Sequence, residues 1–161
     1  MKGEQTRRGF LGAMGFGVPM GLLAGEGISG ASEPTPKPAR RNISSIPNAI
    51  VPLAVVSGNY VFVSGVVGNK PGQRELAGDD AGSQGQQAIE NLKKSLEIAG
   101  SKLEQVVKFN CYLSDEKDSV FFNKVYNEAF PSDGPALTTV IVKGLTFKGA
   151  KVQVDCIATM G

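Results

Sequence analysis

The chain has 161 residues, of which 41% are hydrophobic and 20% are charged, and its formal net charge is only +2. This composition is typical of a globular domain, and the weak charge argues against binding nucleic acid through a basic surface. Histidine is absent, which removes the commonest general base at neutral pH and the commonest metal ligand. The two cysteines, Cys111 and Cys156, lack CxxC spacing, so no metal site is expected.

The first 31 residues have the features of an export signal. Arg7 and Arg8 precede a Gly-rich apolar run over residues 9–25, and residues 29–31 are small enough for a signal peptidase. Residues 6–11, TRRGFL, resemble the twin-arginine signal. The alternative is a chance arginine pair before a membrane anchor, for which the apolar run is short. We predict a cleaved signal over 1–31, a periplasmic or exported location reached by the twin-arginine route, and no membrane attachment after cleavage.

A Pro-rich stretch follows the predicted signal. Residues 32–41 read SEPTPKPARR, and closely spaced prolines favour an extended, unpacked chain. We therefore assign residues 32–43 to a linker and residues 44–161 to one folded domain.

The domain begins with a predicted β-hairpin. Residues 51–56 and 60–65 are rich in β-branched and aromatic side chains, and Ser57-Gly58-Asn59 between them favours a turn. Residues 66–78 carry Gly and Pro and are expected to form a loop with a short strand. They lack the Gly-Lys-Ser/Thr sequence of a phosphate-binding loop.

Two helices are predicted beyond the hairpin. Asp79 and Asp80 open the first and Gly100 closes it, and its apolar positions recur at helical spacing. Capping-box spacing at 101–104 indicates a brief helical turn. The second helix begins at Ser114 or Asp115 and ends at Phe130-Pro131. Its expected apolar stripe is Phe121, Phe122, Val125 and Ala129.

Three further strands complete the domain. Residues 107–113 and 151–158 alternate between apolar and polar side chains, which predicts strands with one buried face, and residues 137–142 form the third. The order ββ(β)αβαββ indicates an α+β fold with a mixed sheet and two helices on one face. Cys111 and Cys156 fall on the apolar faces, where they are expected to act as small buried hydrophobes. The alternative is a disulfide between them, which requires that their two strands are neighbours.

The ordered set of motifs resembles the RidA (YjgF) family of enamine/imine deaminases, over residues 47–158. The sequences that carry this resemblance are Gly58-Asn59, Ser64-Gly65, Ile98-Ala99-Gly100, Val106-Val107-Lys108, Asp115, Asn123-x-x-Tyr126-x-x-Ala129-Phe130, Pro135-Ala136 and Lys151 to Ala158. The resemblance implies a chorismate-mutase-like fold, a homotrimer with ligand sites between subunits, and no cofactor. It also implies hydrolysis of 2-imino acids to 2-keto acids and ammonia.

Members of this family hold the substrate carboxylate with an Arg directly after Pro-Ala, and they use a Glu in the last strand to position the attacking water. The aligned positions here are Leu137 and Gln153. A frequent Cys two residues beyond the Arg is Thr139, and the first-strand Tyr aligns loosely with Leu53. Ser64, Gly65 and Asn123 are retained.

These departures leave the role of the seven positions open. Leu137 and Thr139 indicate either a pocket remodelled for a more apolar ligand or a filled, inactive cleft. Gln153 suits binding more than proton transfer because an amide does not ionise, but it could also be an interface residue. Ser64 could contact a ligand or serve strand geometry, and Asn123 could simply brace its helix.

A substitute for the missing charges is not evident from the sequence. Arg74 and Lys143 are not convincing replacements for the family's Arg within one subunit, and Asp155 is either a displaced acid or part of an interface ion pair.

Three functions are consistent with this sequence. The first is an exported trimer that binds a small metabolite and whose deaminase activity is weak or lost. The second is a working imine or enamine deaminase that uses other groups. The third is an RNA- or protein-interaction role, although the near-neutral charge argues against RNA.

Overall fold

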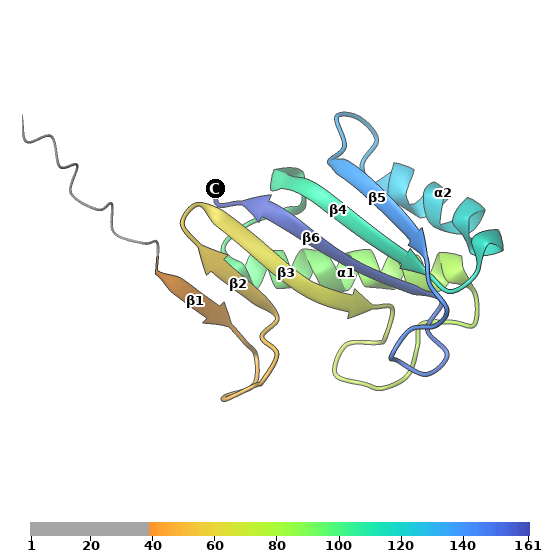
Figure 1. The fold of residues 1–161 in the computed structure, drawn as a ribbon, viewed down its shortest axis with the longest axis horizontal. Helices are drawn as coiled ribbons and strands as arrows, with labels where there is room; N and C mark the ends of the chain where they lie inside the picture. Colours follow the sequence, from red (N-terminus) through yellow and green to blue (C-terminus); the bar gives the residue numbers. More distant parts are fainter. Residues whose placement is uncertain (1–38) are drawn as a thin grey trace, which may run out of the picture. The chain divides into compact units, whose positions relative to one another are not determined.

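The computed structural model describes residues 39–161. The predicted signal and most of the predicted linker lie outside these residues. The described chain forms a six-stranded sheet with two α-helices (Figure 1). The strands are β1 (Arg40–Ile43), β2 (Ala54–Ser57), β3 (Tyr60–Val67), β4 (Val106–Leu113), β5 (Ala136–Ile141) and β6 (Val152–Thr159). The helices are α1 (Ala81–Ala99) and α2 (Ser119–Ala129).

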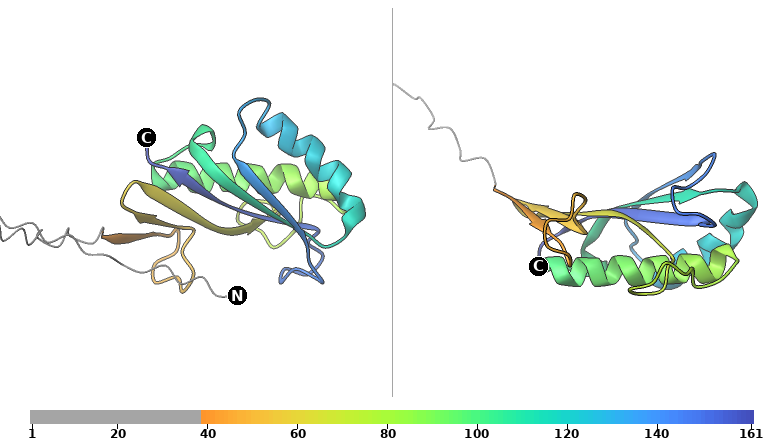
Figure 2. Two further views of the ribbon diagram at one scale, coloured as in Figure 1. Left: turned by 45° about the horizontal axis from the view of Figure 1, so that its top comes forward. Right: turned by 90° about the horizontal axis from the view of Figure 1, so that it is seen from below.

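The strands follow the order β1-β2-β3-β6-β4-β5 across the sheet. Only β4 and β5 are parallel, and α2 makes the crossover between them. All other neighbours are antiparallel. Both helices lie on one face of the sheet (Figure 2), so the predicted α+β fold with a mixed sheet is confirmed.

The predicted linker is wrong at its end, because Arg40–Ile43 pairs with Ala54–Ser57 as strand β1. Three of its four residues are exposed, and only Ile43 is buried in the core. No alternation marks such a strand in the sequence, and pairing with β2 is what fixes it. The hairpin predicted from residue 51 also starts later, at Ala54.

Helix α1 begins and ends where the sequence predicts. The Asp80 side chain accepts a hydrogen bond from the Ser83 backbone N–H at 2.8 Å, which satisfies one of the free donors at the helix start. Gly100 ends the helix with φ of 90°, a left-handed conformation that suits glycine. A short 3₁₀ turn at Leu103–Gln105 follows.

The second helical segment differs from its prediction in two respects. A 3₁₀ turn at Glu116–Asp118, capped by Asp115, precedes α2. Phe121 is 57% exposed rather than part of the buried stripe. Phe122 is fully buried and, with Tyr126 and Phe130, packs around Phe109 of β4. These rings hold α2 against the sheet.

The core lies between the sheet and the helices. The predicted alternation in the last strand is confirmed, because Val152, Val154, Cys156 and Ala158 are all buried. Cys111 and Cys156 are buried and free, as expected of small hydrophobes. Desolvation raises the pKa of both thiols to about 12, so they stay protonated at neutral pH.

The opposite face of the sheet and strand β5 are not covered within one chain. Every residue of β5 is exposed, and Tyr60 and Phe62 of β3 are also exposed. Among residues 39–161, no helix combines the length and apolar character needed to cross a membrane.

Candidate functional site

A β-bulge in strand β3 holds two of the predicted site residues. Val63 pairs with Cys156 and Val66 pairs with Val154, so Ser64 and Gly65 together oppose the single residue Asp155. Bulges of this kind bend a strand and redirect side chains, and they are frequent beside active sites. The alternation rule used for the sequence did not reveal this irregularity.

Ser64 is fixed by the segment before β2. Its backbone N–H donates to the Leu53 carbonyl at 2.9 Å, and its hydroxyl donates to the Pro52 carbonyl at 2.7 Å. These bonds bring Leu53 to the bulge. Because the hydroxyl proton is already donated, Ser64 offers a ligand its oxygen lone pairs.

Gly65 lies directly against Gln153. A Cβ on Gly65 would stand 2.6 Å from Gln153 Nε2, closer than side-chain atoms approach one another. Gln153 itself is half-buried and lies between Val67 of β3 and Tyr112 of β4. Glycine at 65 therefore makes room for the Gln153 amide, and Leu53, Ser64, Gly65 and Gln153 form one group, which we call the β3–β6 group.

The remaining predicted site residues lie elsewhere. Leu137 and Thr139 are on the edge strand β5, which β4 separates from β6. They pair with Phe109 and Cys111, so they lie on the helix side of the sheet. Leu137 is nevertheless 40% exposed, and Asn123 is exposed on α2. One chain thus assembles four of the seven predicted positions and leaves the other three exposed on β5 and α2.

Acid and base groups are scarce around the β3–β6 group. Asp155 faces the bulge and accepts a hydrogen bond from Asn110 Nδ2 at 2.7 Å. Desolvation, followed by a hydrogen bond and charge interaction with Asp155, raises the pKa of Tyr112 above its usual value. In the part of the chain from residue 39 onward, no group of His, Cys, Asp and Glu side chains could hold a metal ion. This arrangement can bind by hydrogen bonds, and Asp155 places a carboxylate opposite its bulge.

A surface pocket of about 400 Å³ adjoins the β3–β6 group. Leu53 and Gly65 line it together with Asn91, Lys94 and Ser95 of α1. The Asn91 amide donates to the carbonyls of Val67 and Asn69 and so ties α1 to the end of β3. Asn91 and Lys94 were not among the predicted site residues, because their spacing in the sequence is typical of the polar side of an amphipathic helix.

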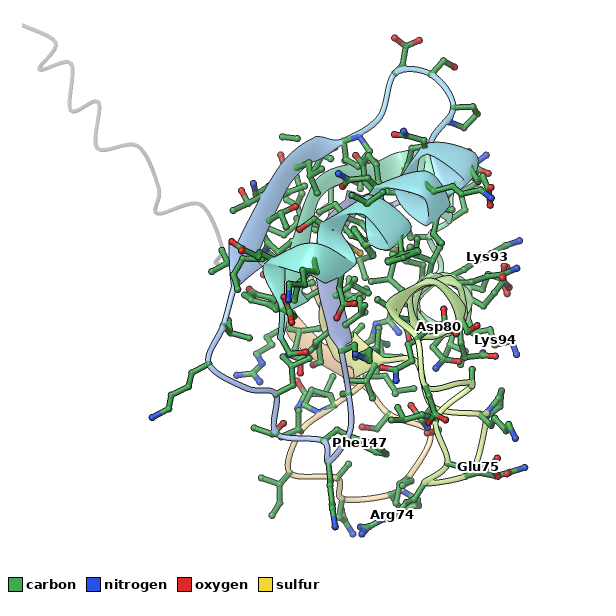
Figure 3. All side chains as sticks on the ribbon, turned by 90° about the vertical axis from the view of Figure 1, so that its right-hand side faces the viewer. Arg74, Glu75, Asp80, Lys93, Lys94 and Phe147 are labelled. Carbon is green, nitrogen blue, oxygen red and sulfur yellow. The ribbon has the colours of Figure 1, made fainter. Side chains whose placement is uncertain are left out.

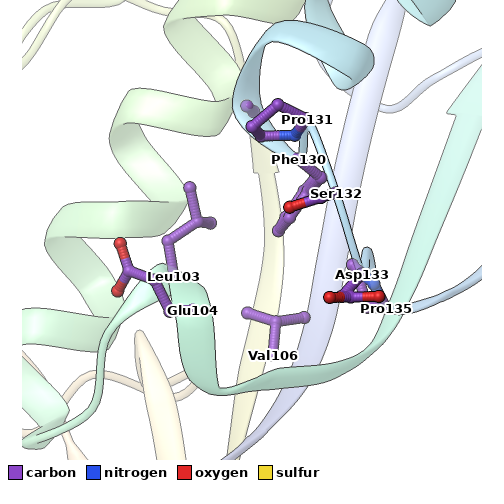
Figure 4. A pocket seen from close by; sticks show the side chains of 9 residues that line it. Leu103, Glu104, Val106, Phe130, Pro131, Ser132, Asp133 and Pro135 are labelled. Carbon is purple, nitrogen blue, oxygen red and sulfur yellow. The ribbon is translucent and has the colours of Figure 1, made fainter.

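A second pocket of about 400 Å³ opens beside the end of α2 (Figure 4). Glu104 and Asp133 lie at its rim, while Leu103, Val106 and Phe130 supply apolar walls. None of the seven predicted site residues lines this pocket.

Comparison with known proteins settles the family. The model of the family described as Endoribonuclease L-PSP matches residues 44–160, which is most of the described chain. This chain belongs to the RidA/YjgF family.

Relatives within the RidA/YjgF family include named deaminases. The human 2-iminobutanoate/2-iminopropanoate deaminase is 31% identical over 126 residues, covering 76% of this chain and 91% of that protein. Protein mmf2, mitochondrial, of Schizosaccharomyces pombe is 40% identical over 107 residues, covering 65% of this chain and 83% of that protein.

Solved structures of the RidA/YjgF family share the fold. RidA from Psychrobacter sp. PAMC 21119 superposes with a TM-score of 0.66 at 33% identity, covering 73% of this chain and 94% of that one. A structure titled putative endoribonuclease L-PSP from Entamoeba histolytica gives 0.69 at 36% identity, covering 76% and 100%.

Proposed function

We propose that this chain binds a small metabolite between the subunits of a homotrimer, and that its hydrolysis of 2-imino acids is weak or lost. Imine/enamine deaminase or a related function is what RidA family relatives suggest. The observation that carries the finer proposal is the replacement of the family's two charged positions by uncharged side chains. Leu137 stands where an Arg would hold the substrate carboxylate, and Gln153 stands where a Glu would assist the attacking water.

The magnitude of these two losses supports weak activity. Removing one partner of a buried, charged hydrogen bond costs about 2–5 kcal/mol, which is roughly 30-fold to several thousandfold in affinity. Removing a general acid or base lowers a rate by roughly 10²–10⁴. The two effects need not add, but either one alone is enough to make deamination poor.

The trimer is supported by the division of the candidate site. RidA family proteins are typically homo-oligomeric and bind small molecules. The β3–β6 group is assembled within one chain, whereas Leu137, Thr139 and Asn123 lie on exposed parts of β5 and α2. A neighbouring copy that placed its β5 edge beside the β3–β6 group would bring Leu137 and Thr139 to these four positions.

A ligand for such a cleft would be less acidic than a 2-imino acid. Leu137 offers an apolar surface, Thr139 a hydroxyl group, and Gln153 both a hydrogen-bond donor and an acceptor. We expect a neutral metabolite with an apolar part and a polar end.

The alternative is an active deaminase that uses other groups, and the names of the relatives favour it. Asp155 is the candidate proton carrier for that reaction, because it lies opposite the Ser64–Gly65 bulge.

The proposed export by a twin-arginine signal over residues 1–31, with the periplasm as destination, applies to either function. It is tested by fractionating cells that express the chain with Arg7→Lys and Arg8→Lys together, a change expected to retain it in the cytoplasm.

Imine hydrolysis by the purified protein decides between the two functions. An amino-acid oxidase generates the 2-imino acid, and semicarbazide traps what is not hydrolysed. We expect little acceleration by the native chain and a clear gain in Leu137→Arg/Gln153→Glu, with Leu137→Arg alone in between. Acceleration by the native chain that Asp155→Asn abolishes would instead establish the active deaminase.

A further inference from the structure

The structure places Arg74 on a well-formed loop between β3 and α1. Asn69 and Leu76 pair across the base of this loop, and the Lys70 backbone N–H donates to the Glu75 carbonyl at 2.8 Å. Glu75 is already engaged by the Lys70 amine. Within residues 39–161, Arg74 makes no ion pair, so its guanidinium is free to bind an anion.

A second loop, between β5 and β6, faces Arg74. Thr146, Phe147 and Lys148 of this loop line a cavity of about 560 Å³ together with Arg74. Phe147 is half-buried, but it does not belong to the hydrophobic core. Figure 3 shows Arg74 and Phe147 at the same end of the molecule, each on its own loop. The cavity therefore has two cations, a hydroxyl group and an aromatic ring.

A single buried side chain holds both loops in place. Gln84 of α1 is only 1% exposed. Its Nε2 donates to the carbonyls of Gly78, at 2.9 Å, and Gly149, at 3.3 Å, and its Oε1 accepts from the Lys151 backbone N–H at 2.7 Å. One residue of α1 thus anchors the end of each loop. Fixing the loops before a ligand arrives lowers the entropy cost of binding.

We propose that this cavity binds a small organic anion, a carboxylate or phosphate attached to a flat apolar group. Arg74 would hold the anion with its planar fork and Lys148 would add a second positive charge. The ring of Phe147 would pack against the flat group. The first loop follows Val67 and the second loop leads into Val152, beside Gln153, which pairs with Val67. This anion site therefore lies at the same sheet end as Gln153. It involves none of the seven deaminase positions and does not depend on the proposed function.

The test is a titration of the full-length protein with benzoate, phenyl phosphate, inorganic phosphate and uncharged benzyl alcohol. Calorimetry gives the Kd, and amide NMR shifts locate the site. We expect benzoate or phenyl phosphate to shift Arg74 and residues 146–148. Arg74→Gln/Lys148→Gln should weaken binding about tenfold, since each exposed charge contributes modestly, and Phe147→Leu should weaken it about threefold. The matched control is Lys93→Gln on α1, away from Arg74 in Figure 3, which should leave the Kd unchanged.

The arms of the titration separate the possible results. The tighter binder of benzoate and phenyl phosphate shows whether the site prefers a carboxylate or a phosphate, and either preference supports the proposed site. The proposal is overturned if benzyl alcohol binds as well as benzoate, if the double variant binds like the native chain, or if Lys93→Gln weakens binding equally. Imine hydrolysis is measured separately on the Leu137 and Gln153 variants, so the two proposals fail independently.

Discussion

The two halves of the candidate site are built in opposite ways. The β3–β6 group sits on the inner strands, where backbone hydrogen bonds fix Ser64 and a glycine leaves space for the Gln153 amide. Strand β5 is an edge strand with all of its residues exposed. The chain therefore fixes one half of the site during its own folding and leaves the other half exposed on an edge strand.

The largest difference between the halves is expected at two glycines. A Cβ on Gly68, just after β3, would lie 2.1 Å from the backbone oxygen of Gln84, and a helix backbone cannot move aside. Gly68→Ala should lower the free energy of unfolding by about 3 kcal/mol. Gly144, just after β5, has no atom within 4 Å of such a Cβ, so Gly144→Ala should stay within about 0.5 kcal/mol. Urea unfolding measures the free energy of unfolding of both variants. Equal losses in Gly68→Ala and Gly144→Ala would contradict the difference between the two halves.

Two valines give a smaller, matched difference. Val154 of β6 is 0% exposed and Val140 of β5 is 42% exposed. Val154→Ala removes two buried methyl groups and leaves a cavity, which should cost about 2 kcal/mol. Val140→Ala should cost less than about 0.5 kcal/mol in dilute protein. The unfolding is then repeated at high protein concentration. If Val140→Ala lowers the free energy of unfolding only at the high concentration, β5 is covered in an oligomer that forms there.

The smallest expected effect concerns the contact between Gly65 and Gln153. Gly65→Ala pushes the end of a flexible side chain, so it should cost only about 1 kcal/mol. In the Gln153→Ser background the amide is gone, and the same change should be nearly neutral. A double-mutant cycle by chemical unfolding measures this coupling. Additive effects would show that the Gln153 amide does not fill the space above Gly65.

Local patterns predicted the parts of the fold that local physics decides. Asp80 and Gly100 define α1 because capping depends on neighbouring residues. The alternation over 152–158 marks a strand because one face is buried. Strand β1 escaped prediction because its exposed residues show no period and only pairing with β2 defines it.

The site was predictable to a lesser degree. Resemblance located Ser64, Gly65 and Gln153, and the structure brings them together. The bulge at Ser64–Gly65 and the anchoring by Gln84 arise from contacts between residues far apart in the chain. Gln84 and Gly149 are 65 positions apart, and no window of sequence contains such a pair.

The order of the strands also has a consequence for synthesis of the chain. The last strand, β6, lies in the interior of the sheet between β3 and β4. Tyr60 pairs with Thr159, so a contact of high sequence separation completes the fold, and proteins rich in such contacts fold slowly. On the ribosome, β3 and β4 would both lack their shared partner until β6 has been synthesised. We therefore expect this domain to become compact only after β6 has emerged from the ribosome, and shorter nascent chains to be more sensitive to proteases than the finished domain.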